Sequence, residues 1–183
     1  NEESRDSASI YSIGEDGDDE KLIYRSPEKE YISELKVSPD GQFVMFQNFL
    51  GFVDYVYIIK SDGKGMKELG KGRHCSFSHN GKYAMFDGIN TDDEDEDEEK
   101  GKGKGDEYST IKIVDLGRAS YKIIKEMKYP MGINSLIGFS SDDKAIVFYD
   151  QEKGYFMRNI EKDDRKELTN YTEPGLFESD SPD

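Results

Sequence analysis

Apolar and aromatic residues occur along this chain in short runs, and turn-forming residues separate one run from the next. The first complete set of runs comprises residues 32–37, 43–47, 55–60 and 66–69. Runs of this length, rich in Val, Ile, Tyr and Phe and bounded by Gly, Pro or Asp, are typical of β-strands. No stretch keeps the apolar spacing of about 3.6 residues that marks a helix. The pattern therefore predicts an all-β fold of antiparallel strands, with helix nearly absent.

A nine-residue pattern that opens with serine and ends with phenylalanine occurs three times. The copies are 38–46, 78–86 and 140–148, and a fourth begins at Ser181-Pro182-Asp183. The serines lie 40, 62 and 41 residues apart, and removal of the 17-residue acidic stretch 91–107 shortens the long interval to 45. A period of about 40–45 residues is typical of four-stranded propeller blades.

Each copy predicts a meander of four strands. In Ser38-Pro39-Asp40-Gly41, Pro fixes φ, Asp bonds its own backbone and Gly accepts a positive φ. A second turn, at Asp62-Gly63, leads to an outer strand of alternating charge that suits a solvent-facing edge. One such sheet buries too little apolar surface alone, so several must stack around an axis.

The succession Ser-Pro-Asp-Gly-x-x-aromatic-x-Phe, Asp-Gly and Lys-Glu-Leu resembles the WD40-like "PD40" repeat of TolB-type β-propellers. Similar repeats form the propeller of prolyl-oligopeptidase-type peptidases. The resemblance covers nearly the whole chain outside 91–107, although His79-Asn80 and Ser141-Asp142 replace Pro-Asp in two copies. It implies a propeller that acts as an interaction scaffold, and an extracytoplasmic location.

The repeat register divides this propeller segment, residues 1–183, into blades. It predicts a partial blade at 1–31, blades at 32–72, 73–132 and 133–174, and the start of another at 175–183. A blade completed by residues 176–179 beside the first segment would still lack its second strand, which a stable sheet does not tolerate. We therefore expect an arc of about four repeats from a larger propeller, with further blades supplied by additional chain or another subunit. The opening residues, with neither an initiator Met nor a signal peptide, indicate a processed or excised chain.

Charge narrows the range of partners. The net charge is −15, and charged residues (36%) outnumber apolar ones (34%). Phosphate binding requires Lys and Arg to displace counterions. The net negative charge therefore argues against nucleic acid and against an anionic membrane surface as partners. No apolar run approaches the roughly 20 residues that span a bilayer. A single cysteine excludes an internal disulfide.

The acidic insertion 91–107 carries ten acids and three lysines. Asp93, Asp95 and Asp97 alternate as in a calcium-binding loop, and carboxylate oxygens are the ligands that Ca²⁺ prefers. Glu98, however, stands where that loop requires Gly, and the closing Glu is missing. We expect a solvated loop that binds calcium weakly, if at all, and that projects from the face opposite the Ser-Pro-Asp-Gly turns.

Three soft donors lie close together in the sequence: His74, Cys75 and His79. The register places the first two on opposite faces of one strand and His79 in a turn, and a zinc site would need a fourth ligand. We therefore expect structural roles, with Cys75 buried. The motif Gly-x-Ser-x-Gly and a phosphate-binding glycine loop are both absent from the sequence. Asn170-Tyr171-Thr172 matches a glycosylation sequon in a predicted link between blades.

These observations favour a non-catalytic propeller that binds a protein, a peptide or another ligand, without a cofactor. The alternative is the substrate-gating propeller of a prolyl-oligopeptidase-type peptidase whose catalytic domain lies outside this chain. A surface module stabilised by calcium at the acidic insertion is a third possibility. A partner is expected on the face from which the insertion projects.

Overall fold

The computed structural model describes residues 7–27, 30–50, 53–88, 108–117, 121–130, 133–150, 154–162 and 165–168. Regular structure in these ranges is entirely β, and no helix there is long and apolar enough to cross a membrane. The strands are β1 (Ser9–Ser12), β2 (Lys21–Arg25), β3 (Tyr31–Val37), β4 (Phe43–Leu50), β5 (Val53–Lys60), β6 (Lys67–Phe77), β7 (Tyr83–Gly88), β8 (Tyr108–Asp115), β9 (Lys122–Pro130), β10 (Ile133–Phe139), β11 (Ala145–Asp150), β12 (Gly154–Asn159) and β13 (Arg165–Glu167). The predicted all-β class is confirmed.

The strands form three sheets, β1–β2, β3 to β9 and β10 to β13, and within each sheet every strand pairs antiparallel with the next strand along the chain. We number the resulting blades in chain order. Blade 1 comprises β1 and β2; blade 2 comprises β3, β4, β5 and residues 67–71 of β6. Blade 3 comprises residues 72–77 of β6 with β7, β8 and β9, and blade 4 comprises β10 to β13.

The strand β6 belongs to two blades. The sequence predicts a short outer strand at 66–69 followed by a link, whereas β6 runs unbroken from Lys67 to Phe77. Lys71 pairs with Tyr55 of blade 2, and Gly72 pairs with Gly88 of blade 3. A Cβ at residue 72 would lie 2.3 Å from the carbonyl oxygen of Asp87, so only glycine fits at this crossing. The chain therefore passes from blade 2 to blade 3 without a loop.

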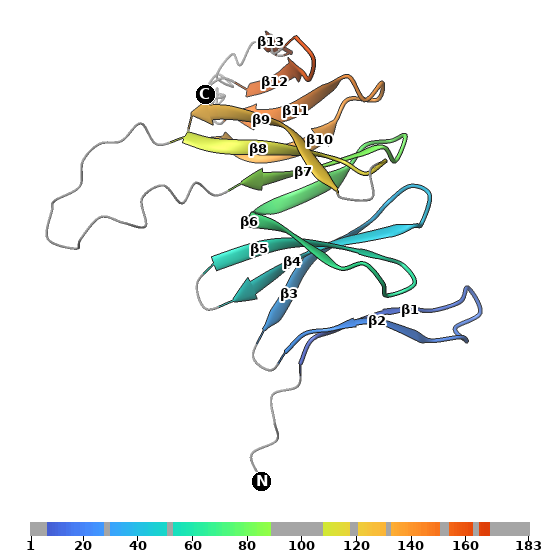
Figure 1. The fold of residues 1–183 in the computed structure, drawn as a ribbon. Helices are drawn as coiled ribbons and strands as arrows, with labels where there is room; N and C mark the ends of the chain where they lie inside the picture. The colour runs from blue at the N-terminus through green and yellow to red at the C-terminus, as the bar shows by residue number, and fades with distance from the viewer. Residues whose placement is uncertain are drawn as a thin grey trace, which may run out of the picture.

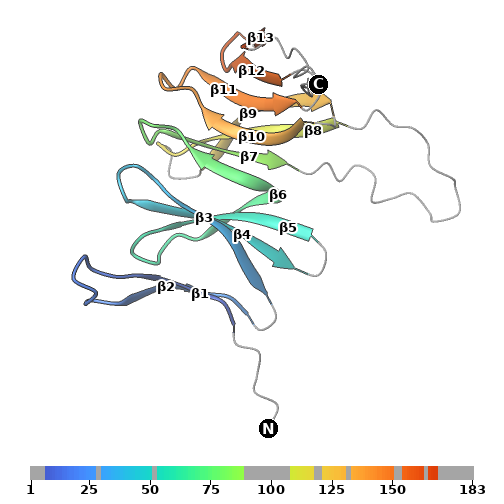
Figure 2. The same cartoon turned by 180° about the vertical axis from the view of Figure 1, so that it is seen from behind.

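The blades are stacked in chain order as an open fan, with blade 1 and blade 4 at its two ends (Figures 1 and 2). Strand β6 contacts both β3 and β10, so the first strands of blades 2, 3 and 4 follow one another along the inner side of the arc. Residues 176–179 lie outside the described residues, so the predicted pairing of the two ends of the chain is untested.

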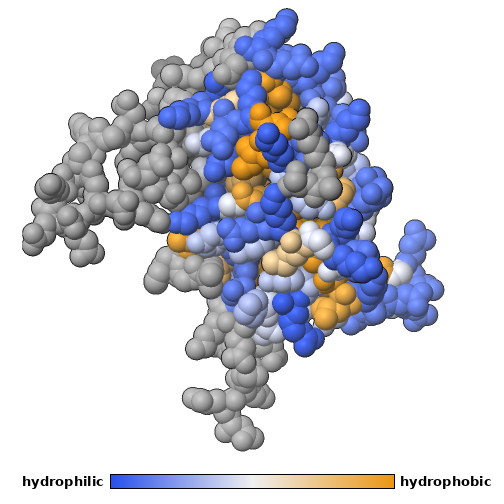
Figure 3. Space-filling model, in the orientation of Figure 1, coloured by the Kyte–Doolittle hydropathy of each residue, from blue (hydrophilic) through white to orange (hydrophobic). Residues whose placement is uncertain are grey.

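Apolar side chains between adjacent blades hold the stack together. Three buried phenylalanines, Phe46, Phe86 and Phe148, occupy the same position in successive repeats. The core between blades 1 and 2 includes Phe46, and the core between blades 2 and 3 includes Phe86. A third core lies between blades 3 and 4. Apolar patches reach the surface along the middle of the stack, among hydrophilic residues (Figure 3). Blade-on-blade packing therefore provides the burial that one sheet lacks.

The turns lie on the face predicted for them. The β3–β4, β5–β6 and β6–β7 turns all project on the same side of the fan (Figure 1). Gly88 and Tyr108, the described strand ends nearest to the insertion, lie at the opposite end of blade 3, where Gly88 pairs with Thr110. We call the two sides the turn face and the insertion face.

Candidate functional site

The serine motif builds the same hydrogen-bonded turn in three successive blades. In blade 2, the Ser38 hydroxyl donates to Asp40 Oδ1 (2.6 Å) and accepts from the N–H of Phe43 (2.9 Å). The N–H of Gln42 donates to the same carboxylate oxygen (3.0 Å). The hydroxyl of Ser38, followed by the N–H of Gln42, lowers the pKa of Asp40.

Blades 3 and 4 repeat these contacts with different residues. Ser78 donates to Asn80 Oδ1 (2.9 Å) and accepts from Tyr83 N–H (2.9 Å). Ser140 donates to Asp142 Oδ1 (2.6 Å) and accepts from Ala145 N–H (3.0 Å). Ser38, Ser78 and Ser140 are all buried. The conspicuous polar residues of the repeat therefore satisfy the backbone of their own turns.

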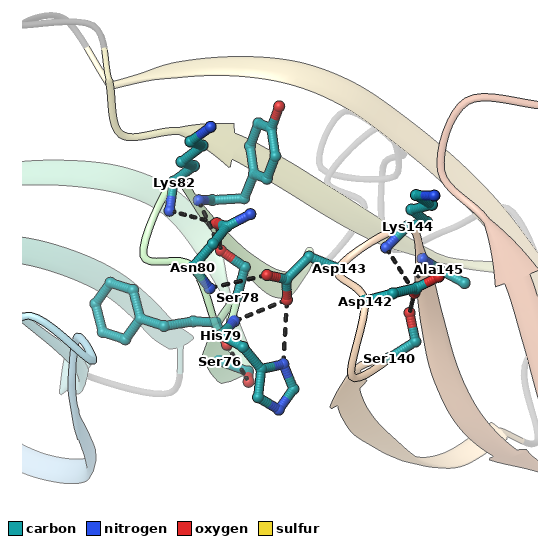
Figure 4. A network of polar contacts seen from close by, with 12 residues as sticks. Ser76, Ser78, His79, Asn80, Lys82, Ser140, Asp142, Asp143, Lys144 and Ala145 are labelled. Carbon is teal, nitrogen blue, oxygen red and sulfur yellow. Dashed lines mark hydrogen bonds and ion pairs between the residues drawn. The ribbon is translucent and has the colours of Figure 1, made fainter.

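One residue departs from the repeat and joins two blades. Asp143 stands where the other turns have Gly41 and Gly81, and all three residues have positive φ, near +57°, +69° and +68°. A carboxylate oxygen of Asp143 accepts from the N–H of His79 at 2.7 Å, and the other accepts from the N–H of Asn80 at 2.8 Å. The His79 ring, through Nδ1, lies 3.1 Å from the first oxygen. We call this arrangement the clasp (Figure 4).

The clasp is nearly closed to water on the aspartate side. The side chain of Asp143 is 7% exposed, whereas that of His79 is 62% exposed. Burial raises the pKa of the Asp143 carboxyl, but the N–H groups of His79 and Asn80 together with the His79 ring outweigh it and lower the pKa. The carboxylate is therefore held in its charged form as a fixed acceptor between blades 3 and 4.

The three soft donors singled out in the sequence have separate environments. Cys75 is buried, and burial, with a smaller contribution from Glu34, raises the pKa of its thiol to about 12. His74 is half-exposed, with Nδ1 3.7 Å from Asp87 Oδ2, while His79 belongs to the clasp. Among the described residues, no group of three or more His, Cys, Asp or Glu side chains is placed to hold a metal ion.

The inner strands carry a feature that the sequence analysis missed. Glu34 and His74 both have positive φ, near +43° and +53°, and each lies at a β-bulge four residues before the turn serine of its blade. At the second bulge, Asp87 Oδ2 lies 3.7 Å from His74 Nδ1 and 3.9 Å from Arg73 Nε. Because Arg73 pairs with Asp87 one residue from Gly88, this ionic cluster lies near the insertion face. Neither residue is a glycine, so the sequence gives no local sign of the bulge.

Two predicted sites fall on residues that the structure does not describe. The calcium-type candidates Asp93, Asp95 and Asp97 lie outside the described residues, as does the sequon Asn170-Tyr171-Thr172. Both remain predictions.

Comparison with known proteins identifies the fold. No protein-family model matches the chain, and neither does any curated protein. Several solved structures share the arrangement. TolB from Acinetobacter baumannii superposes with a TM-score of 0.55 at 16% identity, over 89% of this chain and 38% of that one. The uncomplexed acylaminoacyl peptidase of Pyrococcus horikoshii superposes with a TM-score of 0.61 at 18% identity, over 90% of this chain and 28% of that one.

The β-propeller domain of the Trilobed protease from Pyrococcus furiosus gives a TM-score of 0.62 at 15% identity, over 90% of this chain and 49% of that one. The chain thus spans less than half the length of each of these structures. Together with the antiparallel blades, the likeness establishes a β-propeller fold, and the partial coverage fits an arc of a larger propeller.

Proposed function

We propose that this chain is a non-catalytic propeller segment that presents a rigid surface to a protein or peptide partner. The turn network and the clasp carry the proposal. The repeated serine and Asp or Asn side chains hold their own turns, and Asp143 with His79 joins two blades. Side chains engaged in this way serve rigidity rather than proton transfer, and rigid surfaces lose little entropy on binding.

The test is a peptide array probed with the folded chain and with a Phe86→Asp variant that breaks the core between blades 2 and 3. If the folded surface binds peptides, the folded chain should bind a set of peptides that the Phe86→Asp variant does not bind. Peptides retained equally by both would indicate attraction to unfolded, acidic chain only. Hydrolysis of acylated or proline-containing peptides by the chain alone would overturn the non-catalytic assignment.

A second candidate is the substrate-gating propeller of a prolyl-oligopeptidase-type peptidase. The likeness to the acylaminoacyl peptidase and to the Trilobed protease propeller favours it. The two candidates differ in what accompanies the chain. A hydrolase domain with Gly-x-Ser-x-Gly, encoded in the same gene, would support the peptidase assignment, and its absence from the complete gene would exclude it.

A further inference from the structure

A shallow groove lies between the outer strands of blades 2 and 3, beside the turn face. It has a volume of about 380 Å³ and is lined by Lys67, Glu68, Leu69, Tyr121, Lys122 and Ile123. Leu69 and Tyr121 belong to the core between the two blades, and Ile123 packs against it. The floor of the groove is therefore a place where this core reaches the surface.

The two walls are held in a fixed relation. Lys67 extends from the wall of blade 2 and donates from Nζ to the carbonyl oxygen of Tyr121 in blade 3 (3.3 Å). The Tyr121 ring stands edge-on to Phe43 of blade 2, with the centroids 5.7 Å apart. A groove whose walls are joined in this way is preformed, which limits the entropy that a ligand must lose.

The backbone beside the groove has the character of a sheet edge. Residues 67–71 of β6 pair with β5 alone, and β9 pairs with β8 alone, among the described strands. Such edges have N–H and C=O groups that an added extended segment can pair with. The exposed side chains of Met66 and Ile124, each 42% accessible, lie in sequence beside the two walls. The surface therefore suits an extended peptide with apolar side chains.

Charge around the groove is opposite to that of the chain. The lysines at the turn-face end of the two outer strands and in the turn before β6 outnumber the acids of the same segments: Lys60, Lys64, Lys67 and Lys122 against Asp62 and Glu68. In a chain of net charge −15, this outer rim is a local concentration of positive charge. Charge complementarity across an interface sets partner choice and the rate of encounter.

We propose that the groove docks an extended acidic segment of a partner protein, with one or two apolar side chains on the floor formed by Leu69, Tyr121 and Ile123. The proposal rests on the proposed scaffold function and specifies its partner. A second copy of the whole chain is a poor occupant, because two molecules of charge −15 repel each other. The segment binds through its carboxylates at Lys67 and Lys122 and through its apolar side chains at the floor.

The experiment measures fluorescence anisotropy of a labelled octapeptide, Glu-Leu-Asp-Phe-Glu-Leu-Asp-Glu, with the full chain at two salt concentrations. Saturable binding that weakens with salt is expected. The double variant Lys67→Glu with Lys122→Glu should weaken binding at least about tenfold. Lys122→Glu alone, which leaves the Lys67 hydrogen bond in place, should weaken it less. A control peptide with Ser in place of Leu and Phe should bind more weakly at equal charge.

Lys162→Glu is the matched control, because this exposed lysine lies on the β12–β13 connection of blade 4. An equal loss of affinity in Lys162→Glu and Lys122→Glu would overturn the groove as the site. If the peptide binds only after deletion of residues 91–107, the chain's own acidic insertion occupies the groove. That result would overturn the proposal that a partner protein occupies it. If neither the full chain nor the chain without residues 91–107 binds the peptide, the groove is not a docking site. The peptide array would still decide the proposed scaffold function.

Discussion

The carboxylate of Asp143 accepts a hydrogen bond from the backbone N–H of His79 at 2.7 Å, across the boundary between two blades and 64 residues apart in sequence. The same aspartate adopts the left-handed backbone conformation that glycine provides in the other two turns. The clasp thus combines an unfavourable backbone conformation with favourable contacts between blades.

Replacement of Asp143 separates these two contributions. Asp143→Gly removes the carboxylate but relieves the backbone, and should lower the free energy of unfolding by about 1 kcal/mol. Asp143→Ala removes the carboxylate and keeps the strain, so it should cost about 1 kcal/mol more. Urea unfolding followed by near-ultraviolet circular dichroism of the tyrosines measures both. If Asp143→Gly proved more stable than the native chain, the contacts of the clasp would be too weak to hold the blades.

The clasp also predicts a dependence on pH. Since the fold lowers the pKa of Asp143 below its ordinary value of 3.8, the stabilisation is fully present above that value and is lost as pH falls through the folded pKa. The difference in unfolding free energy between the native chain and Asp143→Asn should shrink as pH falls below about 4, because the carboxyl then becomes protonated. A difference that grew towards acid pH would contradict a lowered pKa for Asp143.

The turn serines should be essential to stability. Ser78→Ala removes the acceptor of the Tyr83 N–H and the donor to Asn80 at a fully buried position. The cost should be about 1–3 kcal/mol in the free energy of unfolding, because a backbone donor loses its partner. Ser141→Ala, at an exposed position of the neighbouring turn, is the control and should change stability by less than about 0.5 kcal/mol.

Cys75 should be chemically silent in the folded chain. Burial raises the pKa of its thiol to about 12, so the reactive thiolate is scarce at pH 8. We expect negligible reaction with a disulfide reagent such as 5,5′-dithiobis(2-nitrobenzoic acid) until urea unfolds the chain, followed by one equivalent of reaction. Rapid reaction of the native protein would show that the Cys75 thiol is accessible to solvent and would support a chemical role for it.

The acidic insertion should attract calcium without a defined site. Calorimetric titration should give weak binding that decreases with salt and changes little in the double variant Asp93→Asn with Asp95→Asn. Saturable binding below about 1 µM that the double variant abolished would instead establish a caged site.

The turns could be predicted from the sequence because their hydrogen bonds join residues five or fewer positions apart, as between Ser38 and Phe43. The clasp has a sequence sign, an aspartate where other copies have glycine, but its partner depends on how two blades pack. The bulges at Glu34 and His74 and the groove beside Tyr121 have no local sign, because both arise from the approach of strands distant in sequence.

The unbroken strand β6 has a consequence for how this architecture can be inherited or redesigned. A boundary can be placed directly between two blades only where the chain leaves one sheet before it enters the next. Between Lys71 and Gly72 there is no such place, since adjacent peptide groups already pair with different blades. A cut that separates these two blades therefore has to fall at a turn inside a repeat, such as residues 78–82 between β6 and β7.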